Sequence, residues 1–272
     1  MQKTILKRLD FTIIQYEELC QAIAGSKYAS ATITSYLQSD KNVKNKPFII
    51  LRHDIDQNAQ HALHIAQIEK KYDLKATYYF RLKKSTYIPQ IIDEIASYGH
   101  EVGYHYETLD TCKGNMESAI KLFKHELSIF RERYNVNTVC AHGNPLTRYD
   151  NKDIWKHIQL SDCGLLGEAF LSLDFRRFAY FSDSGRTWVN SKAQKMLGKD
   201  DVTTAFDYLR PRSTYNIIKI INDGTIPNIC VLTHCERWSD DIINFSSRYL
   251  VDLAFSWGKV AIYFYRWLGK RK

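Results

Sequence analysis

Carboxylates and histidines that could bind a metal ion and transfer protons follow several apolar runs in this sequence. The first pair, Asp54 and Asp56, comes directly after residues 48–51, four apolar residues typical of a strand with both faces buried. Two carboxylates at this spacing suit a metal ligand beside a general base. A structural interpretation explains the segment equally well: Asp54 ends the strand in a turn, and Asp56 or Asn58 caps the following helix.

Histidines at the ends of later apolar runs favour the chemical interpretation. His105 and Glu107 follow residues 100–104, His142 lies in an Ala-His-Gly-Asn-Pro segment, and His234 closes the run 229–233. In α/β sheets and barrels, ligands bind where the strands end and the loops begin. One histidine at a strand end is usually a hydrogen-bonded structural residue, but four such strand ends in one chain predict a common site.

The elements that position these residues alternate from Pro47 onward between strand and helix. The helix predicted over 113–134 is the clearest, because its apolar residues recur every three or four positions in one stripe. Regular alternation with short connections predicts a parallel sheet, either open or closed into a barrel. The predicted strands are 48–53, 76–81, 100–105, 136–141 and 229–234, and the predicted helices are 58–72, 86–98, 113–134 and 213–222.

The remaining segments complete a single domain of 272 residues. Residues 1–46, with a helix over 11–24 and a short strand within 29–37, form an N-terminal cap. Residues 47–238 form the main α/β unit, in which 162–171 and 178–181 are predicted to be strands. Residues 239–272 form a C-terminal helical extension that is too interrupted by polar residues for a membrane span.

Composition indicates an ordinary globular protein, with 44% hydrophobic and 25% charged residues. A net charge of +8 favours anionic partners. We expect no nucleic acid among them, because no recognised binding motif or dense basic stripe is present. The start lacks an apolar stretch of signal-peptide length, so we expect a cytoplasmic protein.

The six cysteines contain no Cys-x-x-Cys pair and are expected to be buried, small apolar residues in a reducing compartment. Cys140 precedes His142 by two positions, and Cys230 and Cys235 flank His234. These positions leave a thiolate ligand open as an alternative.

Four motifs resemble the polysaccharide deacetylase family, carbohydrate esterase family 4, over roughly residues 47–238. They are Leu-Arg-His-Asp-Ile-Asp at 51–56, Ala-Thr-Tyr-Tyr-Phe-Arg at 76–81, Gly-His-Glu-Val-Gly-Tyr-His at 99–105 and Leu-Thr-His at 232–234. The chain is most similar to a divergent branch associated with surface-polysaccharide biosynthesis. The resemblance implies a distorted (β/α) barrel of about seven strands and metal-dependent removal of acetyl groups from amino sugars.

The resemblance also implies roles for individual residues. Asp54 corresponds to the general base of the family, Asp56 and His105 to metal ligands, and His234 to the general acid. His100 corresponds to a position that is usually not a ligand, and we expect it to be structural.

The chain departs from the family pattern at two positions. The second metal histidine of the family is replaced by Leu109, and the arginine that usually braces the base is replaced near residues 141–143. A third ligand then has to come from His142, Glu107 or water. We favour a site rebuilt around His142. The alternative is a non-catalytic relative, with a degraded metal site, that binds a glycan or a lipid-linked sugar.

The resulting functional prediction is metal-dependent hydrolysis of an N-acetyl or N-formyl amide on an amino sugar in lipopolysaccharide O-antigen or capsule biosynthesis. The sugar could be carried by a nucleotide, a lipid or a polymer. Mixed Asp/His ligation fits zinc, with iron, cobalt and nickel as alternatives.

Four further residues are candidate substrate contacts. Arg81 could bind substrate or pair with Asp54 or Asp56. Arg186 could grip a carboxylate or phosphate in a forked contact, and Trp188 beside it could pack on a sugar ring. Trp238 could line the pocket. Burial in the core explains Trp188 and Trp238 equally well.

The C-terminal end carries a concentration of basic residues. A solvated tail explains these side chains, and attachment to an anionic inner-membrane surface is the alternative. The residues are Lys259, Arg266 and 270–272.

Overall fold

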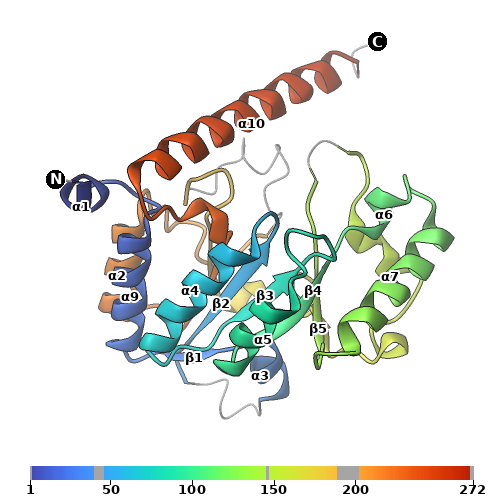
Figure 1. Cartoon of the computed structure of the whole chain (residues 1–272), viewed down its shortest axis with the longest axis horizontal. Helices are drawn as coiled ribbons and strands as arrows, with labels where there is room; N and C mark the ends of the chain where they lie inside the picture. Colours follow the sequence, from blue (N-terminus) through green and yellow to red (C-terminus); the bar gives the residue numbers. More distant parts are fainter. Residues whose placement is uncertain (1, 40–45, 145–146, 189–201, 270–272) are drawn as a thin grey trace.

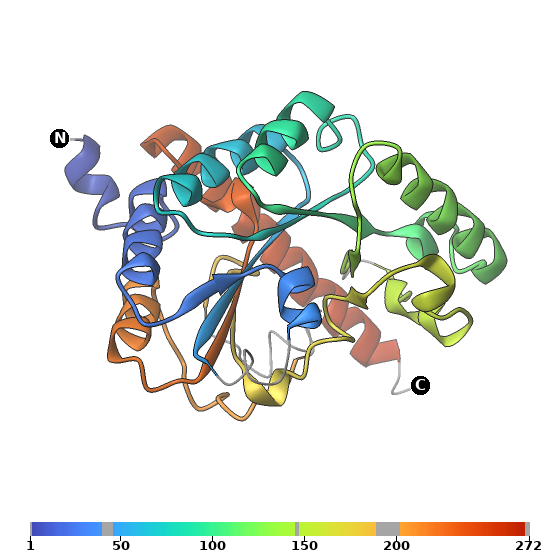
Figure 2. The same cartoon turned by 90° about the horizontal axis from the view of Figure 1, so that it is seen from below.

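The computed structural model describes residues 2–39, 46–144, 147–188 and 202–269. These residues form one sheet, in which every strand pairing is parallel. The sheet curls without its two end strands meeting, which confirms the predicted distorted barrel (Figure 1, Figure 2). The strands are β1 (Ala29–Ala31), β2 (Phe48–Ile55), β3 (Thr77–Phe80), β4 (Glu101–Tyr106), β5 (Thr138–Ala141), β6 (Gly167–Glu168), β7 (Ala179–Ser182) and β8 (Asn228–Thr233).

The strand order is β6-β5-β4-β3-β2-β8-β7, and β1 pairs with the start of β2. Because all strands run in the same direction, their carboxyl ends meet at one end of the curl. Along the described chain, no helix combines the length and the hydropathy needed to cross a membrane.

Helices cover the outer face of the sheet, with α4 and α5 next to each other in Figure 1 and α7 at the right of the picture. Their sequences carry the signals of helix ends: Asn58 and Asn115 accept hydrogen bonds from the first turns of α4 and α7. The apolar stripe predicted in 113–134 is buried at Phe123, Leu127 and Phe130. The helices are α1 (Gln2–Leu6), α2 (Ile13–Ala24), α3 (Ile33–Gln38), α4 (Ala59–Lys71), α5 (Pro89–Ser97), α6 (Thr108–Thr111), α7 (Met116–Arg131), α9 (Thr214–Asp223) and α10 (Ile242–Gly269).

The side chains of β2 alternate between two buried compartments. Ile49 and Leu51 pack in the core between the sheet and the helices, whereas Phe48 and Ile50 pack inside the curl. A strand has a side-chain period of two, so the even-numbered residues that follow also face the inside of the curl. This alternation decides which residues of each strand end reach the candidate site.

Two predicted segments differ from the structure. Only Ala29–Ala31 of the predicted strand 29–37 is extended, because the side chain of Thr32 accepts a hydrogen bond from Ser35 N and starts α3. The N-terminal segment is therefore part of the sheet as well as a cap.

In 162–171, the strand is limited to Gly167–Glu168. The Glu168 carboxylate accepts hydrogen bonds from the backbone N–H groups of Phe170 and Leu171, which turn the chain out of the sheet.

Candidate metal centre

The inward-facing residues at four strand ends converge on Asp56. The Nε2 atom of His105, on β4, lies 3.4 Å from Asp56 Oδ1. The Nε2 atom of His142, which follows β5, lies 3.6 Å from the same oxygen. His234, which follows β8, places Nε2 3.9 Å from Asp56 Oδ2. Ligand atoms of Asp56, His105 and His142 all lie within 4.8 Å of one another, so these three residues can hold one metal ion.

Hydrogen bonding of His105 is compatible with a cation between these groups. The Nδ1 atom of His105 lies 3.0 Å from the backbone carbonyl of Cys140, which can only accept a hydrogen bond. In the neutral ring, Nδ1 therefore carries the proton and Nε2 turns a lone pair towards Asp56. Asp56 Oδ1 is buried and has no hydrogen-bond partner among the described residues. A buried carboxylate oxygen that faces imidazole lone pairs is the donor set of a divalent metal.

The protonation states agree with this assignment. Burial lowers the pKa of His142 to about 4, although the charge of Asp56 acts in the opposite direction, so the ring is neutral at pH 7 and free to bind a metal. Burial raises the pKa of Asp56, but the positive charge that His105, His142 and His234 carry when protonated lowers it by more, so the pKa of this carboxyl lies well below its ordinary value.

Glu107 lies behind His142 rather than among the ligands of that group. Its Oε2 atom is 3.5 Å from His142 Nδ1, close enough for an ion pair, but this nitrogen makes no hydrogen bond to any described residue. The Glu107 carboxylate is also held by Arg81 and by Lys83, whose Nζ is 2.6 Å from Oε1. Arg81 therefore pairs with carboxylates of the site, the second of the two alternatives considered for it, and Nη1 lies 4.0 Å from Asp56 Oδ1.

Leu109 is buried in the core between the sheet and the helices. Leu109 is the second residue of α6 and offers no ligand atom, and His142 is the third member of the group formed by Asp56 and His105.

Arg52, which sequence reasoning did not assign, holds the predicted base Asp54 in a forked contact. Its Nε and Nη2 atoms donate hydrogen bonds of 2.9 and 2.7 Å to the two carboxylate oxygens, and its side chain is fully buried. Burial raises the pKa of Asp54, but the charges of Arg52 and His105 lower it by more, so the base is ionised. The signal was present in the sequence, because residues two apart on a strand share a face.

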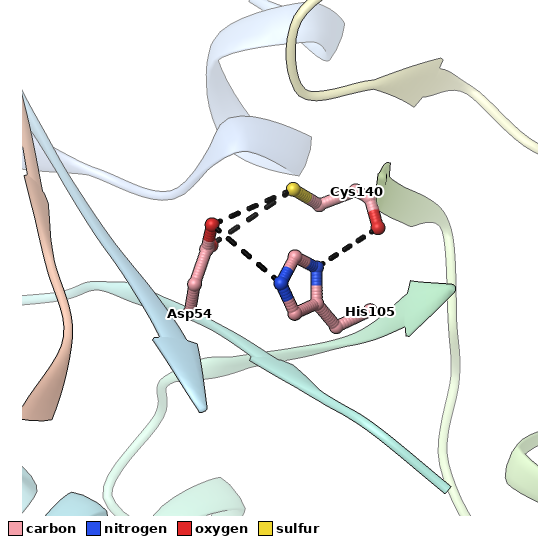
Figure 3. Close-up of side chains that lie close together, drawn as sticks. All are labelled: Asp54, His105 and Cys140. Carbon is pink, nitrogen blue, oxygen red and sulfur yellow. Dashed lines mark hydrogen bonds and ion pairs between the residues drawn. The ribbon is translucent and has the colours of Figure 1, made fainter. Parts of the chain in front are cut away.

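Cys140 lies beside Arg52 and Asp54 in a second group of candidate donors that also includes His105 (Figure 3). Its Sγ atom is 3.8 Å from Asp54 Oδ2 and 2.8 Å from Arg52 Nη2. The guanidinium already supplies a positive charge to this thiol and carboxylate. The group around Asp56 is therefore the stronger candidate for a metal site.

Asp183 is a second residue that sequence reasoning did not single out, and it supports His234. Its Oδ1 lies 2.6 Å from His234 Nδ1, and its Oδ2 accepts a hydrogen bond of 2.9 Å from His234 N. Burial and Arg237 lower the pKa of His234, but Asp183 and Asp56 raise it by more, so the net shift is upward. The contact depends on the pairing of β7 with β8, which no local pattern in the sequence reveals.

Glu236, two residues after His234, is a further buried acid near this group. Its Oε2 atom has no hydrogen-bond partner among the described residues. Burial and the charge of Asp56 raise the pKa of Glu236 to about 7.

The structure does not support the substrate contacts predicted for Arg186, Trp188 and Trp238. Trp188 and Trp238 are 2% and 0% exposed, and both pack against Phe11 in the core, so neither ring has a face free for a sugar. Arg186 is turned towards α10, where its Nη1 lies 3.4 Å from Asp252 Oδ2.

Phe170 is a partly exposed aromatic residue close to the base. The Arg52 guanidinium lies 4.1 Å from the centre of its ring. Phe170 also lines a cleft together with Lys152 and Leu171.

Comparisons with known proteins give a limited result. No family model matches the sequence, and no curated protein matches it. Among solved structures, a CE4 esterase from Streptococcus mutans matches with 16% sequence identity and a TM-score of 0.43, over 86% of this chain and 90% of that chain. A similarity of this extent does not by itself establish a family or an activity.

Proposed function

We propose that this protein is a metal-dependent amidohydrolase that removes an acetyl or formyl group from the nitrogen of an amino sugar. The observation that carries the proposal is the unpartnered Oδ1 atom of Asp56, which faces the Nε2 atoms of His105 and His142. Asp54 and His234 adjoin this group with opposite predicted roles in proton transfer. The resemblance to carbohydrate esterase family 4 supplies the substrate class.

Amide hydrolysis needs a base that activates water and an acid that protonates the leaving amine, and Asp54 and His234 would supply them. Water is a poor nucleophile at neutral pH, and the ionised Asp54, held by Arg52, takes its proton as the water attacks the carbonyl carbon. The amine is a poor leaving group as an anion, and His234 donates a proton to its nitrogen as the C–N bond breaks.

Asp56, His105 and His142 would hold the metal. A bound divalent ion lowers the pKa of a coordinated water molecule and polarises the carbonyl group. Two imidazoles and one carboxylate favour zinc, with iron, cobalt and nickel as alternatives.

The biological context is also part of the proposal. The reaction would belong to lipopolysaccharide O-antigen or capsule biosynthesis in the cytoplasm, on a nucleotide-linked, lipid-linked or polymeric amino sugar. The His-Asp-x-Asp motif at 53–56 and the His-Tyr-Glu motif at 105–107 support this assignment through their resemblance to the branch associated with surface polysaccharides.

Metal content and acyl release test the proposal directly. We expect near-stoichiometric metal in protein purified without chelators or affinity metals, and its loss in Asp56→Ala, His105→Ala and His142→Ala. His125→Ala is the control, because His125 is exposed on α7. Asp54→Asn should keep the metal but release acetate or formate about 10²–10⁴-fold more slowly, because an amide cannot take the proton.

Absence of metal, even after incubation with each candidate cation, would contradict the proposal. The non-catalytic glycan-binding alternative would then be favoured. Metal binding that is insensitive to His142→Ala would instead contradict the assignment of the third ligand.

A further inference from the structure

The long helix α10 exposes apolar side chains on the face that points away from the protein. Ile243 is 78% exposed, Leu250 64% and Leu253 43%. These residues are spaced by seven and three positions, so they share one side of the helix. On the opposite side, Arg248 and Asp252 are partly buried against the rest of the protein. Phe245 is half-buried on that side as well, and Ser246 and Ser247 are exposed beside the apolar side chains, so the outward face of these turns combines large apolar residues with small polar ones.

The side of α10 that faces the protein is fixed to two loops that carry site residues. Arg248 Nη1 donates a hydrogen bond of 2.9 Å to Oε1 of Gln57, the residue directly after Asp56. Asp252 pairs with Arg186, which lies on the loop that also carries Asp183. Figure 1 shows α10 as a rod across the end of the molecule towards which β2 points. A surface that bound the outer face of α10 would thus lie close to the candidate site.

The charge of this segment indicates what the apolar face contacts. Residues 242–272 contain six basic residues and one acidic residue, a net charge of 6 − 1 = +5. Two copies packed through these helices would bring like charges together, whereas an anionic bilayer offers apolar chains beneath negative headgroups. The sequence from residue 255 onward is also rich in phenylalanine, tyrosine and tryptophan, which are typical of membrane–water interfaces.

We propose that α10 binds the surface of an anionic lipid bilayer, with Ile243, Leu250 and Leu253 inserted at the headgroup boundary. The strand ends that carry Asp56 and Asp183 would then lie near the surface, where a lipid-linked substrate would be presented. The binding itself rests on α10 alone and does not require the proposed reaction.

Flotation of the purified full-length chain with lipid vesicles tests this proposal. We expect binding at low salt to vesicles of phosphatidylcholine with phosphatidylglycerol, weaker binding to phosphatidylcholine alone, and release at high salt. Leu250→Glu should lower the ratio of bound to free protein about tenfold or more, since it removes a leucine that would be buried in the bilayer and adds a negative charge. Tyr215→Glu is the matched control, because Tyr215 is 67% exposed on α9 and the charge change is identical.

Three outcomes would overturn the proposal. The wild-type chain could stay unbound at low salt, or Leu250→Glu and Tyr215→Glu could bind equally well. The third is a dimer in light scattering that Leu250→Glu converts to a monomer, which would assign the face to a second copy of the chain. Asp54→Asn should float as the wild-type protein does, so failure of the proposed reaction is separable from failure of membrane binding.

Discussion

At the scale of single residues, the candidate site gives each proton-transfer group its own buried counter-charge. Arg52 lowers the pKa of Asp54, and Asp183 raises the pKa of His234. Two titratable groups whose pKa values are pushed in opposite directions can act as base and acid at the same pH.

Replacement of Asp183 by asparagine tests whether the carboxylate of Asp183 sets the pKa of His234 as the general acid. Asp183 raises the pKa of His234, so Asp183→Asn should lower it. A general acid is active below its pKa, and the rate falls as the pH rises through that value. The alkaline limb of the pH profile of kcat/KM should therefore move to lower pH. An unchanged alkaline limb would contradict the role of His234 as the acid.

Sequence reasoning brought together five residues that the structure also places in one group: Asp54, Asp56, His105, His142 and His234. It succeeded because strand ends of a parallel sheet share one edge, which local patterns reveal. It left open whether Trp188 and Trp238 line the pocket or the core, because side-chain exposure depends on the packing of distant segments. Asp183 was missed for the same reason, since its contact with His234 joins two strands.

At the scale of elements, strand β2 and helix α4 are joined by a polar network on the outer face of the sheet. The Glu69 carboxylate of α4 accepts hydrogen bonds from Tyr16 (2.6 Å) and Tyr78 (2.5 Å), and its Oε1 lies 2.8 Å from His53 Nε2. All four side chains are fully buried. Burial raises the pKa of Glu69, but His53 and the other partners lower it to about 2, so the network holds an ionised carboxylate.

This network predicts a pH-dependent stability. Because the pKa of Glu69 is lower in the folded protein (about 2) than its ordinary value of 4.5, its contribution is full above pH 4.5 and is lost as the pH falls towards 2. The unfolding free energy of the wild type should exceed that of Glu69→Gln by about 3 kcal/mol near pH 7 and by about 1 kcal/mol near pH 3. Denaturant titrations at both values measure this difference.

Glu132→Gln provides the control for this comparison, because Glu132 is exposed. A wild-type advantage over Glu69→Gln that is equal at both pH values would contradict the role of the Glu69 charge.

Elements were predictable from sequence in proportion to their length. Helices α4 and α7 have several turns, and their apolar periodicity and N-cap residues identify them. Strands β1 and β6 have three and two residues, too few for a period, and they form because β2 and β5 lie beside them. Short elements of this kind depend on tertiary pairing that the local sequence does not encode.

At the scale of the whole molecule, the parallel sheet gathers the candidate metal ligands from strands that are distant in sequence. A metal bound by Asp56, His105 and His142 connects β2, β4 and β5, and the unfolded chain does not preserve this arrangement. A ligand that binds only the folded state stabilises it. The proposed metal should therefore contribute to the stability of the entire domain.

Chelation tests this contribution. Removal of metal from the wild-type protein should lower its thermal midpoint by several degrees, and the proper cation should restore it. Asp56→Ala, which lacks the ligand shared by both histidines, should show no response to the chelator. Equal midpoints of the wild type with and without chelator would contradict a metal that bridges the three strands.

The alternation of β2 has a consequence for how faithfully the chain folds. Arg52 and Asp54 face the inside of the curl, and His53 faces the network of Glu69. If β2 slipped by one residue against its neighbours, the ion pair of Arg52 and Asp54 would enter the layer that belongs to Glu69, and Glu69 would lose its contact with His53. Misaligned pairing of this strand thus buries an ion pair among apolar side chains and removes the histidine partner of a buried carboxylate. The same charged residues that prepare the site for chemistry also help to fix the register of the central strand.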